Sequence, residues 1–177
     1  MTQKEDYKKT FWTEASKWGL IAGLGMCVIK LISGFISSGF VTFLLLALQF
    51  ILLYTVNMKV GRKMSSLKTA REGFTFGQAF TVILATMFFA GIIYGAGEFI
   101  QSRIDPSYFN NIFNSETLKS VYSEDMVDMI QRERDSMMPY VRSPFTIIIA
   151  GIMNMCLLGG MVGILNSALL RRPPMPE

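Results

Sequence analysis

Apolar residues gather into four long blocks along the chain, at about 18–37, 40–57, 78–99 and 145–169. Each block holds 18 to 25 residues, and charged residues are almost absent from it. Crossing a bilayer core of about 30 Å takes roughly 20 residues of α-helix. The pattern therefore predicts an all-α integral membrane protein, with four transmembrane helices in a single membrane domain over residues 1–177.

A more polar segment, at about 100–143, separates the third block from the fourth. Asp105-Pro106 is typical of a helix start, and a second, amphipathic helix is predicted from about Glu116 to Met138. One side of this second helix is apolar and rich in Met, and the other side is acidic. The apolar stripe either covers the outer ends of the spans or meets a partner. Its acidic residues lack the D-x-D-x-D-G spacing that folds oxygen ligands around calcium.

The starts of the last two spans carry capping signals. Thr75 and Gln78 form the T-x-x-Q of a capping box before the third span. Ser143 followed by Pro144 is typical of an N-cap and a first helical residue at the start of the fourth.

Composition agrees with a membrane protein. Hydrophobic residues make up 51% of the chain and charged residues 17%, whereas soluble domains carry about 25% charged residues. The beginning does not resemble a signal peptide, because its polar lead is long and no small-x-small cleavage site follows the first block. We therefore expect the first block to remain as a true span.

The distribution of charge predicts the topology, because basic residues close to span ends mark the cytoplasmic side. The 100–143 segment has five basic and seven acidic residues. We expect both termini in the cytoplasm and this segment in the periplasm, in the inner membrane of a bacterium. Because the basic residues serve topology, they do not indicate nucleic-acid binding. The eleven basic residues expected at the cytoplasmic side are Lys4, Lys8, Lys9, Lys17, Lys59, Arg62, Lys63, Lys68, Arg71, Arg171 and Arg172.

Glycine pairs with G-x-x-x-G spacing occur in three of the four spans. Small residues let helices approach closely in lipid, where no hydrophobic force drives them together. The pairs predict a tight four-helix bundle or a seam between copies in a homo-oligomer. The second span, with "TFLLLALQFILLY", is Leu-rich and bulky, so we expect it to face lipid. The paired glycines are Gly19 and Gly23, Gly91 and Gly95, and Gly159 and Gly163.

Three polar residues lie within about 20° of the glycine stripe on their own helix, at 100° per residue: Lys30, Glu98 and Asn166. Polar groups in a membrane usually point into the bundle, so these stripes predict its interior. Lys30 and Glu98 are predicted at about 10 Å and a few Å below the outer surface, respectively. Three alternatives remain open: the two pair, they snorkel separately, or they handle protons or ions. We expect Glu98 to be a structural anchor and not a catalyst.

Three motifs carry a resemblance to a known family: "YTVNMKVGRK" (54–63), "GFTFGQAF" (73–80) and "IDPSYFNNI" (104–112). With four spans in this order, the chain resembles the bacterial "domain of unknown function 4199" membrane protein family over about residues 10–170. The resemblance implies a small integral membrane protein of bacteria. It implies no catalytic or ligand-binding residues.

Side chains that carry chemistry are scarce. The chain has no His, its Cys27 and Cys156 both fall near mid-span, and no acidic pair has helical metal-ligand spacing. We therefore expect no catalytic residue, cofactor or metal. The sequence favours a non-enzymatic inner-membrane subunit, scaffold or assembly factor that meets the lipid bilayer and either a second copy or a membrane or periplasmic protein. The alternative is a small oligomeric transporter or channel, whose path would be lined by Lys30, Gln49, Gln78, Glu98, Asn154 and Asn166.

Overall fold

The computed structural model describes residues 3–35, 39–69, 72–104 and 124–174. Its helices are α1 (Gln3–Phe35), α2 (Gly39–Ser66), α3 (Phe76–Ile104), α5 (Glu124–Val141) and α6 (Pro144–Leu170). Within these ranges the only extended pairing is an isolated bridge between Phe74 and Arg172. All of the helices except α5 are long and apolar enough to cross a membrane. The prediction of an all-helical chain with four spans is confirmed at this level.

The helices are longer than the apolar blocks that revealed them. α1 already begins at Gln3, and α2 continues to Ser66, nine residues past the predicted end of its span. Hydropathy marks only the part of a helix that lies in lipid, while Lys, Arg and Met are good helix formers and let it continue into water. In the polar segment, α5 runs to Val141. The predicted helix start at Asp105 and residues 116–123 lie outside the described residues.

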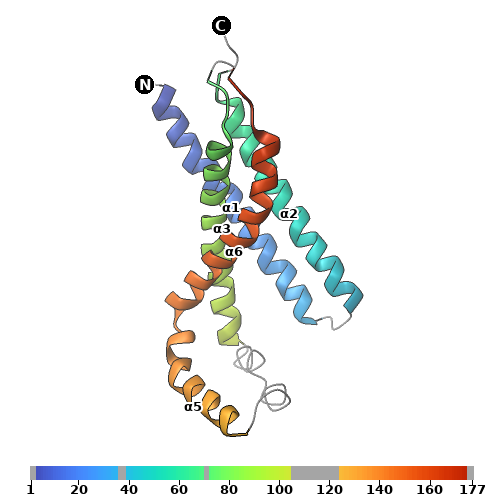
Figure 1. The fold of residues 1–177 in the computed structure, drawn as a ribbon, viewed down its shortest axis with the longest axis vertical. Coiled ribbons are helices and arrows are strands. Elements are labelled where there is room, and N and C mark those ends of the chain that lie inside the picture. The colour runs from blue at the N-terminus through green and yellow to red at the C-terminus, as the bar shows by residue number, and fades with distance from the viewer. Residues whose placement is uncertain (1–2, 36–38, 70–71, 105–123, 175–177) are drawn as a thin grey trace.

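Helix α3 lies at the centre of the arrangement, between α1 and α6, while α2 packs beside α1 and α6 (Figure 1). The N-terminal end of α1, the C-terminal end of α6 and the start of α3 lie at one end of the molecule. The C-terminal end of α1, the N-terminal end of α2 and helix α5 lie toward the other. Successive spans therefore alternate in direction, so α1 and α3 run parallel to each other.

The four long helices share one core, and many large apolar side chains outside it are exposed. Half of the most apolar 18 residues of α3 are buried, but only 11% of those of α2. This fits the expectation that the second span faces lipid. The inner end of α2 behaves differently, because Val56, Val60 and Met64 are at most 2% exposed.

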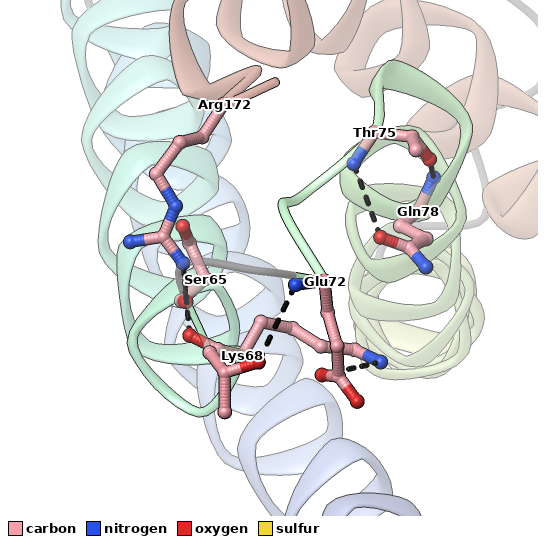
Figure 2. Close-up of polar contacts among 7 residues, drawn as sticks. Ser65, Lys68, Glu72, Thr75, Gln78 and Arg172 are labelled. Carbon is pink, nitrogen blue, oxygen red and sulfur yellow. Dashed lines mark hydrogen bonds and ion pairs between the residues drawn. The ribbon is translucent and has the colours of Figure 1, made fainter. Parts of the chain in front are cut away.

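The helix starts follow the capping signals. The Thr75 amide donates to Gln78 Oε1 at 3.1 Å, and the Gln78 amide donates to Thr75 Oγ1 at 3.2 Å (Figure 2). Ser143 Oγ accepts from the Thr146 amide at 3.2 Å, and Pro144 is the first residue of α6. Both capping predictions are confirmed.

Candidate functional site

An ion pair joins α1 to α3 within their apolar stretches. Lys30 Nζ contacts Glu98 Oε1, and the two side chains are 29% and 14% exposed. The Lys30 ammonium also lies over the ring of Tyr94, 5.6 Å from its centroid. An ammonium over an aromatic face is attracted by the ring quadrupole. Tyr94 and Glu98, one turn apart on α3, therefore hold the same cation.

Small side chains bring α1 and α3 close enough for this pair to form. A Cβ on Gly97 would lie 2.5 Å from Cys27 Sγ, and that thiol lies 3.9 Å from the carbonyl oxygen of Ile93. A larger residue at Gly97 would have to displace the Cys27 thiol. The structure places the two charges together, whereas separate snorkelling would send each to the interface.

A second set of polar contacts joins α2 to α6. Asn57 Nδ2 donates to the carbonyl oxygen of Gly159 at 3.2 Å, and Asn166 Nδ2 donates to that of Tyr54 at 3.1 Å. Both asparagines are fully buried. One bond runs from α2 to α6 and the other from α6 to α2, so the two side chains clamp these helices together.

Some oxygens of this second set have no hydrogen-bond partner among the described residues: Asn57 Oδ1, Asn166 Oδ1 and Ser167 Oγ. A buried acceptor without a partner costs about 1–3 kcal/mol. Buried polar groups of this kind are where proteins hold ordered water.

A third set of contacts ties the end of the chain to the 67–75 link (Figure 2). Arg172 Nη2 donates to the carbonyl oxygens of Ser65 at 3.2 Å and Lys68 at 2.8 Å, which are acceptors at the end of α2. Its backbone exchanges two hydrogen bonds with Phe74, at 2.8 and 2.9 Å. Gly73 permits this approach, since its φ of +64° suits glycine and a Cβ there would lie 2.7 Å from the Arg172 carbonyl oxygen.

The G-x-x-x-G residues of α1 and α6 face α3. A Cβ on Gly19 would lie 2.7 Å from the carbonyl oxygen of Thr86, and one on Gly23 would lie 2.7 Å from that of Ala90. On α6, Gly159 and Gly163 face side chains of α3 in the same way.

The glycines of α3 lie where two backbones meet. A Cβ on Gly95 would lie 2.7 Å from Ile148 Cα, and one on Gly91 would collide with Ile152 Cα. Gly151 of α6, which the sequence reasoning did not single out, completes this contact, because its Cβ would lie 2.6 Å from Gly95 Cα. All the paired glycines thus have neighbours inside the chain itself.

The polar residues of the alternative transport path do not gather in one place. Gln78 belongs to the capping box at the start of α3, Gln49 is partly exposed on α2, and Asn154 is exposed on α6. Asn166 lies between α2 and α6, whereas Lys30 and Glu98 lie between α1 and α3. The predicted path is therefore not assembled within a single chain.

Sequence reasoning missed Asn57 and the contacts of Arg172. Asn57 lies inside "YTVNMKVGRK", one residue after Val56 and three before Val60, both buried. Because Val56 and Val60 lie on the same side of the helix as Asn57, this spacing could have predicted that the Asn57 amide is in the core. Arg172 was assigned a topological role alone, and no local pattern links it to Ser65, 107 residues earlier.

Groups that could ligate a metal do not cluster in the described part of the chain, where no three His, Cys, Asp or Glu side chains come together. Cys27 and Cys156 are free thiols on α1 and α6.

A comparison with protein families identifies the family of the chain. A family model described as "Protein of unknown function (DUF4199)" matches residues 17–172, and the resemblance drawn from the three motifs is confirmed. Neither the comparison with curated proteins nor the comparison with solved structures gave a match.

Proposed function

The chain belongs to the DUF4199 family, and from this premise we propose that it is a non-enzymatic inner-membrane protein acting as a subunit, scaffold or assembly factor. One observation carries the proposal: four polar side chains inside the spans bind other helices. Lys30 meets Glu98 across α1 and α3, and Asn57 and Asn166 donate to backbone carbonyls across α2 and α6. An active site or a transport path would gather such groups around one cavity.

We assign the contact with a partner to α5. The paired glycines all contact residues of the same chain, which favours another surface for the partner. Helix α5 instead projects beyond the bundle (Figure 1). Met126, Met129 and Tyr140 are 45%, 56% and 75% exposed on it. Exposed Met and aromatic side chains are enriched at protein interfaces.

The orientation that this function requires is cytoplasmic termini with α5 in the periplasm, and cysteine labelling tests it. In a chain whose own cysteines are replaced by alanine, we expect Ser136→Cys on α5 to react with a membrane-impermeant thiol reagent in intact spheroplasts. Ser66→Cys, at the C-terminal end of α2, is expected to react only after lysis. Both serines are exposed, so a difference in labelling reports the side of the membrane on which each lies. Reaction of Ser66→Cys in intact spheroplasts would overturn this orientation.

Photo-crosslinking in native membranes tests the partner surface. We expect a photoreactive residue at Met126 or Met129 to give a discrete protein adduct, because both side chains are exposed on α5. Phe43 on α2, 67% exposed, is the matched control and should react with lipid alone. A pattern in which the α5 positions give no protein adduct contradicts the proposed contact.

A further inference from the structure

A groove of about 420 Å³ lies between α1 and α3 and is open on one side. Apolar side chains line most of its length, with Leu20 from α1 and Phe89 and Ile93 from α3. Towards the N-terminal end of α1 the lining changes to Ser16 and Lys17. The groove is thus amphipathic along its axis, and its volume is in the range of small-molecule sites.

The groove follows from how α1 crosses α3. The two backbones are closest at Gly19 and Gly23, and α1 then diverges from α3 towards its N-terminus (Figure 1). The two helices touch at the glycines and separate towards the N-terminus of α1, and this leaves the groove beside their crossing. Trp12 stands near its rim, 51% exposed, with its ring edge-to-face on Phe89 at 6.2 Å between centroids.

The polar end of the groove lies at the level of lipid headgroups. Lys17 is thirteen residues from Lys30, which is roughly 20 Å of helix. With Lys30 about 10 Å below one surface of a hydrocarbon core of about 30 Å, Lys17 lies near the other surface. Leu20 and Ile93 are then within the hydrocarbon, as an acyl chain would be.

The charge at this end is positive. Lys17 is exposed, and Lys9, also exposed, lies eight residues earlier on α1. The nearest acid on this part of α1, Glu14, accepts a hydrogen bond from Trp18 Nε1 at 3.1 Å. Asp6 lies almost a turn beyond Lys9, farther from the apolar lining.

We propose that this groove binds a phospholipid with an anionic headgroup. One acyl chain lies along Leu20, Phe89 and Ile93, and the headgroup phosphate lies against the ammonium of Lys17. Basic pockets between membrane helices are sites where anionic headgroups bind. The site is independent of the proposed partner surface, which lies on α5 at the opposite end of the molecule.

Tryptophan quenching by brominated lipids tests the site, because Trp12 and Trp18 are the two tryptophans of the chain. In a Trp18→Phe background, Trp12 remains as a reporter beside Phe89. The protein is placed in phosphatidylcholine vesicles, and either brominated phosphatidylglycerol or brominated phosphatidylcholine is titrated in. We expect phosphatidylglycerol to quench at about fivefold lower mole fraction, which is the preference that one lysine near an anionic lipid gives.

Three variants separate this site from general attraction to the membrane. Lys17→Gln should bring the preference close to one, whereas Lys63→Gln, which removes an exposed lysine outside the groove, should leave it unchanged. Ser16→Phe keeps Lys17 but fills the groove, and should also abolish the preference. Thermal melting of each variant in phosphatidylcholine confirms that it is folded.

Several results would overturn the proposal. They are the absence of a preference in the parent chain, equal losses in Lys17→Gln and Lys63→Gln, and an intact preference in a folded Ser16→Phe. Retention of phosphatidylglycerol by the unmodified chain, counted by native mass spectrometry, repeats the comparison without the Trp18→Phe change. Equal retention of both lipids there would overturn it as well.

Discussion

Replacing Gly95 by leucine is expected to lower the free energy of unfolding by about 3 kcal/mol or more, the upper range for overpacking a tight contact. Even a single Cβ at this position would lie 2.7 Å from Ile148 Cα. That neighbour is backbone, so no side chain can turn away to make room. Helices α3 and α6 would have to separate, and they would lose the contact around Gly151 along their interface. The measurement is unfolding by a denaturing detergent in mixed micelles.

Gly77 on the same helix provides the matched control, since a Cβ there would have no neighbour within 4 Å. Gly77→Leu should be neutral or stabilising by up to about 1 kcal/mol, because leucine is a better helix former than glycine. The free energy of unfolding of Gly95→Ala should lie between those of the two leucine variants. If Gly95→Leu unfolds like the parent chain, or if Gly77→Leu is equally harmful, the close contact of α3 with α6 is wrong.

Removing either partner of the Lys30–Glu98 pair is expected to destabilise the bundle by about 1–2 kcal/mol, between the values for exposed and for buried pairs. Glu98→Gln leaves the ammonium of Lys30 with the Tyr94 ring but without the carboxylate. Lys30→Met leaves a carboxylate that is only 14% exposed. The double variant loses both charges together. A double-mutant cycle should therefore give a coupling of about 0.5–1.5 kcal/mol.

The Lys68–Glu72 pair serves as a control for this cycle. It spans 3.5 Å between nitrogen and oxygen, at i,i+4 spacing, with the Glu72 side chain 49% exposed. Ion pairs near the surface contribute about 0.2–1 kcal/mol, so we expect its coupling to be the smaller one. Additive effects of Lys30→Met and Glu98→Gln would show that the two charges act separately. Unchanged stability in Glu98→Gln, with loss of a pH-dependent cellular phenotype, would favour the transporter alternative.

The features that local sequence encodes agree with the structure. Four apolar blocks were enough to predict four long helices, because the length of an apolar run is set by the thickness of the bilayer. The capping box at Thr75 and Gln78 and the N-cap at Ser143 were also predictable, since each involves residues three apart. The motifs indicated the family over about residues 10–170, and the family model matches residues 17–172.

The sequence by itself thus determined the four apolar spans, the starts of the last two and the family, while the tertiary structure decided which residues meet. That α3 is central, that Gly151 meets Gly95, and that Asn57 reaches Gly159 all depend on how the helices are rotated about their axes. Arg172 and Ser65 are brought together only when α6 is packed beside α2. The physical reason is that hydropathy and capping act within one helix. Rotation and crossing are set by close packing between helices that lie far apart in the sequence.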